Sequence, residues 1–84
     1  MPFWPEGQPI EVELDADGAV QSFRWQRQEH RVRWVSVQWR VHLAWWTEHE
    51  VWRDYCEVVT ETRLLCSIYQ DRLTLAWRLE RVYE

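Results

Sequence analysis

Apolar and polar residues alternate strictly in the segment IEVELD, which begins at Ile10. Because successive side chains of a β-strand point to opposite faces, Ile10, Val12 and Leu14 would lie on one face and the acidic residues on the other. The next residues, DADG, are typical of a type I turn in which Gly18 adopts the positive φ of a G1 bulge. The segment AVQSFRWQR then forms the return strand. The sequence therefore predicts a β-hairpin near the start of the chain.

The segment QEHRVRWVSVQWRVHL, residues 28–43, fits two kinds of element. Strand alternation is present at Val35, Val37, Trp39 and Val41. A helical stripe is present at Val35, Trp39, Leu43 and Trp46. The abundance of β-branched and aromatic residues favours the strand. Val32 and Trp34 fall on the other parity from Val35, which predicts a bulge or a register change near Trp34.

The rest of the chain predicts a connection and three more strands. We expect AWWTEHE to connect the strand of residues 28–43 to the next strand. This connection would include one helical turn, because Thr47 and Glu50 have capping-box spacing. VWRDYCEVVT and RLLCSIYQ predict a second hairpin around turn residues Glu61 and Thr62. The closing segment DRLTLAWRLERVYE predicts a strand with one face shared by Trp77, Leu79, Arg81 and Tyr83.

Together these segments predict an all-β fold. We expect a single small antiparallel domain of about six strands over residues 9–84, in a curled sheet or small barrel that hides its edges. Residues 1–8 predict an extended N-terminal arm, because its prolines fix φ and disfavour helix in the residues before them. Phe3 and Trp4 lie in this arm, where they either fold back onto the core of the domain or reach a second subunit.

Tryptophan is the most unusual part of the composition. The 84 residues include eight Trp, three Tyr and two Phe. A domain of this length buries only about 60–65% of its unfolded surface, so part of this ring area should stay exposed. Trp45 and Trp46 are adjacent and point to opposite sides of an extended chain. The hypothesis is that at least one of Trp45, Trp46 and Trp52 contacts a protein partner, a second copy of the chain included.

Nucleic-acid binding is the alternative function. Residues 21–42 hold five arginines and one glutamate, a net charge of +4, although the whole chain carries −4. Arginine interleaved with tryptophan is typical of single-strand binding, and this surface on residues 24–40 would consist of Arg24, Trp25, Arg27, Arg31, Arg33, Trp34 and Arg40. The same arginines could instead pair with Glu11 and Glu13 across the sheet.

Residues arranged for catalysis are not evident. The sequence has no glycine-rich phosphate loop, and its three histidines do not fall at metal-ligand spacings. We therefore expect a non-enzymatic protein without metal or cofactor. Cys56 and Cys66 lie nearly symmetrically about the turn at residue 61, so they are either a cross-strand disulfide or two small buried hydrophobes. Without a signal peptide or a run of about 20 apolar residues, the sequence predicts a soluble, cytoplasmic protein that does not enter a membrane.

Four stretches of the sequence resemble a known family: PIEVELDADGAVQSFRWQR, AWWTE, YCEVVTETRLL and IYQDRLTLAWRLERVYE. The family is a small uncharacterised bacterial domain, found alone or at the C-terminal end of Y-family DNA polymerase homologues of the ImuB type. Its most specific pattern here is the Trp45–Trp46 pair together with Tyr69, Asp71, Trp77, Leu79, Arg81, Val82 and Tyr83.

Two turns depart from the pattern of that family. The glycines expected between Arg27 and Arg31 and near Glu61 are absent. The resemblance implies no active site. It implies a binding role linked to translesion synthesis or the DNA damage response, with a Y-family polymerase-like protein as a partner.

Overall fold

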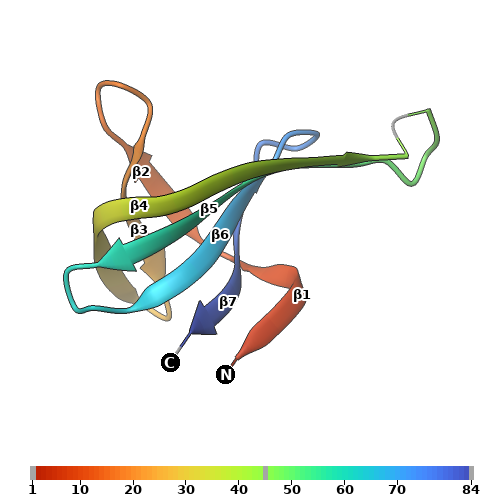
Figure 1. The fold of residues 1–84 in the computed structure, drawn as a ribbon. Helices are drawn as coiled ribbons and strands as arrows, with labels where there is room; N and C mark the ends of the chain where they lie inside the picture. Colours follow the sequence, from red (N-terminus) through yellow and green to blue (C-terminus); the bar gives the residue numbers. More distant parts are fainter. Residues whose placement is uncertain (1, 45, 84) are drawn as a thin grey trace.

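The chain forms one curled antiparallel sheet of seven strands (Figure 1). The structure, a computed structural model, describes residues 2–44 and 46–83. The strands are β1 (Phe3–Pro9), β2 (Glu11–Leu14), β3 (Val20–Trp25), β4 (Gln28–Leu43), β5 (Val51–Thr60), β6 (Leu65–Asp71) and β7 (Trp77–Tyr83). Their order in the sheet is β1-β7-β6-β5-β4-β3-β2. The described residues contain no helix, so the predicted all-β antiparallel class is confirmed.

The sheet curls into a half-barrel because its two edge strands are consecutive in the sequence. Ile10 alone separates β1 from β2, and its N–H donates to the carbonyl of Trp77 at 3.2 Å. One continuous stretch thus pairs with β7 through its first half and with β3 through its second half. Residues Phe3–Pro9, in the segment predicted as an N-terminal arm, form the edge strand β1, which pairs with β7 of the same domain.

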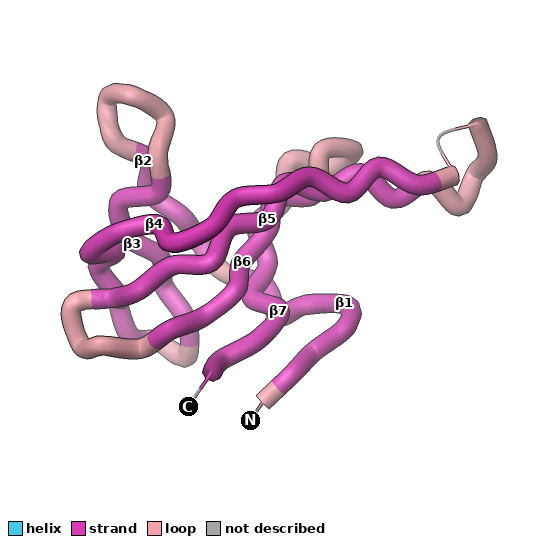
Figure 2. The backbone as a smooth tube through the Cα atoms, viewed as in Figure 1, coloured by secondary structure: helices cyan, strands magenta, loops and turns pink. Residues whose placement is uncertain are grey.

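Strand β4 is the longest strand, and it pairs with two other strands along its length. Its first residues, Gln28–Arg31, pair with β3, and the stretch from Val32 to Leu43 pairs with β5. The register with β5 shifts between Val32 and Trp34 and again between Val35 and Val37, which confirms the predicted bulge near Trp34. Beyond the body of the sheet, the far ends of β4 and β5 continue as a projecting hairpin (Figure 2).

The core lies on the concave face of the curled sheet. Its fully buried side chains are Val58, Cys66, Ile68 and Leu79, and Phe23 of β3 covers them. Alternate positions of β5 and β6 supply this face, because cross-strand partners share one side of a sheet. The other parity of β6 is buried as well, at Ser67 and Tyr69, so this strand is covered on both faces.

The two cysteines are free and buried in this core, so the disulfide alternative is not realised. Register places Cys56 opposite Ile68 and Cys66 opposite Val58, so the two thiols are diagonal neighbours rather than direct partners. Burial raises the pKa of Cys66 to about 12. Both side chains act as small hydrophobes that stay protonated.

Two local predictions are wrong. The described residues of the connection, 44 and 46–50, form no helical turn: Thr47 Oγ1 accepts the N–H of His49 at 3.1 Å in a side-chain turn, and Glu50 contacts His42 instead. The last strand does not keep one face, because Ser67 pairs with residue 81 while the next residue pairs with Leu79. This bulge turns both Leu79 and Val82 into the core and sends residues 81 and 83 to the outer face.

The two turns without glycine use left-handed conformations at other residues. Gln26 and Arg27 have φ values of 52° and 63° between β3 and β4, and Arg63 has a φ of 67° between β5 and β6. Where the sequence does supply glycine, at Gly18, φ is 83° as the hairpin signal predicts. The hairpins therefore form without glycine at these two turns.

Candidate docking surface

An apolar row runs along the outer face of β4, away from the core. Its members are exposed by 52%, 46%, 39% and 60%, in the order Trp34, Val37, Trp39 and Leu43. Their register partners on β5 are outer-face residues such as Tyr55 and Glu57, whereas Val35 pairs with Val58 of the core. We name these four residues the β4 apolar row. Exposed apolar residues on one strand form a contiguous surface rather than scattered positions.

Trp39 is held in place by a ladder of rings across three strands. Its ring stacks on Tyr55 with centroids 5.0 Å apart and planes within 4°. Tyr55 contacts Tyr69 at 5.1 Å, and the hydroxyl of Tyr69 donates to the carbonyl of Glu6 at 3.0 Å. Arg53 lies over the Tyr69 ring at 4.4 Å and donates to the Tyr55 hydroxyl at 3.1 Å. A half-exposed indole fixed in this way is a rigid anchor, which loses little conformational entropy on binding.

One edge of β4 has no neighbouring strand over much of its length. Pairing with β3 ends at Arg31, and from there to Leu43 the only strand paired with β4 in the described part of the chain is β5. Both bulges precede Val37, so Val37–Leu43 is a regular stretch of edge. We name it the free β4 edge. Such an edge presents unpaired backbone N–H and C=O groups, which other strands can bind.

The hairpin beyond the body carries the predicted tryptophans. Trp52 is half-buried: it stacks on His42 at 4.7 Å, and its carbonyl accepts the N–H of Arg72 at 2.7 Å. His42 also lies 2.6 Å from Glu50 through Nε2 and Oε2. Trp46 is 72% exposed in the connecting loop, while Trp45 lies outside the described residues. Trp46 is thus the most accessible described member of the predicted trio.

The two aromatic residues of β1 separate into different surroundings. Trp4 is half-buried against the core and meets Trp25 edge to face at 5.8 Å. Phe3 is exposed, and the guanidinium of Arg81 lies 4.5 Å from its ring centroid. Trp4 therefore folds back onto the core of its own domain, whereas Phe3 lies at the surface against Arg81.

The predicted nucleic-acid residues do not form one basic stripe. Opposite Arg24 in the sheet stand Glu11 on β2 and Glu29 on β4. Arg31 lies 3.8 Å from Glu61, and Arg40 donates to Asp54 at 2.6 Å. Carboxylates of neighbouring strands and of the β5–β6 turn thus lie beside or opposite three of the five arginines in residues 21–42.

The two tryptophans of that predicted surface differ in access. Trp25 packs against the core, and its Nε1 donates to Gln8 at 3.3 Å. Trp34 is exposed, with the guanidinium of Arg33 5.4 Å from its ring centroid. Arg27 lies in the β3–β4 turn, apart from that pair in the sheet. Within the predicted nucleic-acid set, Arg33 and Trp34 are the pair in which the structure brings an arginine to an exposed ring.

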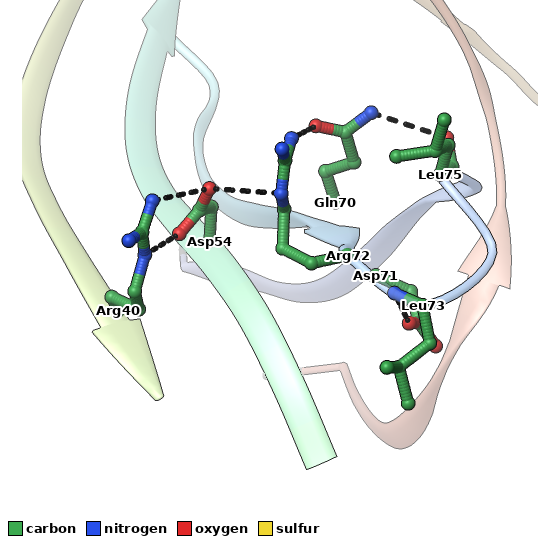
Figure 3. A network of polar contacts seen from close by, with 7 residues as sticks. All are labelled: Arg40, Asp54, Gln70, Asp71, Arg72, Leu73 and Leu75. Atoms are coloured by element: carbon green, nitrogen blue, oxygen red, sulfur yellow. Dashed lines mark hydrogen bonds and ion pairs between the residues drawn. The ribbon is translucent and has the colours of Figure 1, made fainter. Parts of the chain in front are cut away.

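A groove of about 870 Å³ opens at the concave end of the sheet and holds a polar network (Figure 3). Asp54 accepts two hydrogen bonds from Arg40, at 2.6 and 3.2 Å, and lies 3.6 Å from Arg72. Arg72 donates to Gln70 at 2.8 Å, and the Gln70 amide donates to the carbonyl of Leu75 at 3.2 Å. The hydrogen bonds from Arg40 lower the pKa of the Asp54 carboxyl. This network ties β4, β5, β6 and the turn before β7 together.

Sequence reasoning missed Val37, Trp39 and Leu43 as exposed residues. Their alternation was visible, but it does not say which parity faces the core. The bulge before Val37 sets that choice, and its exact place depends on pairing with β5.

Within residues 2–44 and 46–83, no group of three His, Cys, Asp or Glu side chains could hold a metal ion. Over the same ranges, no helix is long and apolar enough to span a membrane.

Comparisons with known proteins found no match: no protein-family model, no curated protein and no solved structure is significantly similar to the chain. The resemblance to the ImuB-associated domain therefore stays a prediction.

Proposed function

We propose that this chain is a non-enzymatic protein-interaction module that binds its partner through the β4 apolar row. One observation carries the proposal: Trp34, Val37, Trp39 and Leu43 are exposed on the same face of one strand. Exposed apolar residues that occur singly need no explanation, but a contiguous group on a small domain is typical of a docking site. The indole of Trp39, fixed by Tyr55, has the character of a binding hot spot.

The proposed partner and location rest on the sequence. A cytoplasmic location fits the two buried cysteines, which are free thiols rather than a disulfide. The family resemblance links the binding role to translesion synthesis or the DNA damage response, with a Y-family polymerase-like protein as one partner. Trp46, exposed by 72% in the loop between β4 and β5, is a further candidate contact.

Nucleic acid is the less favoured partner on charge grounds. Three of the five arginines in the candidate set stand beside or opposite carboxylates of neighbouring strands. Phosphate binding needs cations that are available to release counterions from the nucleic acid. These contacts reduce the accessible positive charge below what the sequence suggests, which favours a protein partner.

Site-specific photo-crosslinking in cells tests the proposal. A photoreactive amino acid in place of Val37 should yield a discrete crosslinked protein band, and Trp39→Ser in the same chain should remove most of it. The matched control is the same photoreactive group in place of Leu73, which is exposed by 49% in the turn between β6 and β7. Equal crosslinking at both positions, or none at position 37, would contradict a docking site on β4.

A DNA titration separates the two classes of partner. Tryptophan fluorescence should not respond to single- or double-stranded DNA at low salt if the module binds protein. Saturable binding that weakens steeply as salt rises would establish the nucleic-acid function instead.

A further inference from the structure

We infer that the free β4 edge pairs with the same edge of a second copy of this chain, so that two sheets become one sheet across a two-fold axis. The inference rests on the proposed function and names one partner for its surface. Residues Val37–Leu43 of each copy would run antiparallel to each other. Strand addition of this kind joins chains through main-chain hydrogen bonds, with side chains giving specificity.

The backbone of the edge supports strand addition. Over Val37–Leu43 the pairing with β5 is regular, with one partner per residue and no bulge. A long, regular edge with apolar residues binds other strands unless bulges, prolines or charges block it. The bulges of β4 lie before this stretch, and its single arginine, Arg40, is paired with Asp54. The devices that usually protect an edge are thus missing from these seven residues.

In the described chain, the outermost part of the projecting hairpin also lacks a third strand. Its last two pairs, His42 with Trp52 and Leu43 with Val51, lie beyond the last pair of β5 with β6. Pairing of β5 with β6 stops at Arg53. Two-stranded ribbons are only marginally stable in water, and a third strand with a shared apolar face makes them stable. A second copy would supply that strand on the β4 side.

The residue pattern of the edge is complementary to itself. A two-fold axis at residue 40 places Val37 opposite Leu43 of the partner subunit, and Trp39 opposite Val41 of the partner subunit. All of these lie on the outer face, so apolar side chains meet apolar ones on both sides of the axis. On the inner face Gln38 meets His42 of the partner subunit. A symmetric dimer requires this match between a surface and its own copy.

Charge at the centre of the proposed interface is already balanced. The axis brings the two Arg40 side chains opposite each other, where unpaired like charges would repel. Each guanidinium, however, donates two hydrogen bonds to Asp54 of its own chain, at 2.6 and 3.2 Å. The central pair is therefore close to neutral on each side.

Sedimentation velocity over a concentration range tests the inference. Seven edge residues make a small interface, so we expect a weak dimer that forms between roughly 10 µM and roughly 1 mM. Amide hydrogen exchange of the wild-type chain should slow at residues 37–43 as concentration rises, and not at the β5–β6 turn. A wild-type chain that stays monomeric throughout this range overturns the inference.

Paired substitutions test the register. V37K/L43K places lysines opposite each other twice in the dimer and should weaken association by about tenfold or more. V37K/L43E converts the same contacts into two opposite-charge pairs and should restore it. The lysine at position 37 is tolerated in the monomer because Glu57 stands opposite it on β5. Circular dichroism checks that each variant is folded.

The control is Leu73→Lys, which changes an equally accessible leucine outside β4 and should leave the dimer intact. A dimer insensitive to V37K/L43K, or one that V37K/L43E does not restore, overturns the proposed pairing. The failure of the docking function itself looks different. If the chain is monomeric but still crosslinks another protein from position 37, the dimer is wrong and the docking site stands. If the chain is monomeric and forms no crosslink at that position, both the dimer and the docking site are wrong.

Discussion

Replacing Gly7 should destabilise the domain far more than replacing Gly18, although both glycines have left-handed backbones. Their φ values are +72° and +83°. A Cβ atom on Gly7 would lie 2.6 Å from the Cβ of Arg78 and 2.9 Å from the hydroxyl oxygen of Tyr69, whereas Gly18 has nothing within 4 Å. Gly7 is where β1 crosses closely over the ring ladder, so the added methyl group has no room.

The expected magnitude follows from comparing the two alanine variants. Each pays the cost of a positive φ in a non-glycine residue, about 1 kcal/mol, and each loses unfolded-state entropy to the same extent. Gly7→Ala adds overpacking against Arg78 and Tyr69, which costs about 1–3 kcal/mol. The difference between the variants should therefore be about 1–3 kcal/mol, a large part of the stability expected for a domain of this size.

Urea denaturation followed by tryptophan fluorescence measures this difference. Gly18→Ala is the matched control, because it shares the backbone penalty without the clash. In thermal melts the same difference should appear as a midpoint lower by about 4–8 °C per kcal/mol for Gly7→Ala. Equal stabilities for the two variants would refute the close approach of β1 to β7 and the ring ladder.

Three further predictions concern buried and paired groups. Tyr69→Phe removes the hydrogen bond from its hydroxyl to β1 and should cost about 1–2 kcal/mol in urea denaturation; an unchanged midpoint contradicts that contact. Burial raises the pKa of Cys56 from 9.0 to about 11 and that of Cys66 to about 12, so the free energy of unfolding should fall as pH rises from 9.0 towards 11. A chain with Cys56→Ala and Cys66→Ala should show a smaller fall, and an identical fall would rule the thiols out as its source. The pKa of Asp54 is lowered by its hydrogen bonds from Arg40, so its stabilisation is complete above about pH 3.9 and is lost below. In the Asp54→Asn variant, the free energy of unfolding should fall less on acidification than in the wild type, by less than about 1 kcal/mol, because the Arg40–Asp54 pair is partly exposed. Acid titrations that match the wild type contradict this role.

The strands were predictable because their signals are local. Alternation with β-branched residues located the stretch that became β4, and the turn at Gly18 located the first hairpin. The prediction of a helical turn in the 44–50 connection was wrong, because it relied on the capping-box spacing of Thr47 and Glu50. In the structure Glu50 contacts His42 across the hairpin. The spacing of residues along the sequence cannot reveal this contact.

The candidate site was only partly predictable. A surplus of exposed tryptophan was expected, and Trp46 shows it, but the row on β4 was not assigned to the surface. Trp25 and Trp34 look equivalent beside arginine in the sequence. Packing against Trp4 half-buries Trp25, while Trp34 stays exposed on the outer face. The difference arises because β1 folds back near one ring and not near the other.

The sequence by itself determined the class of elements, because strand periodicity and turn residues act over a few neighbouring positions. It also determined the excess of aromatic area over what a short chain can cover. Only the tertiary structure decided which residues face outwards and which edge stays unpaired. Bulges and strand order set both properties, and they depend on pairing between strands far apart in the chain, such as β1 with β7.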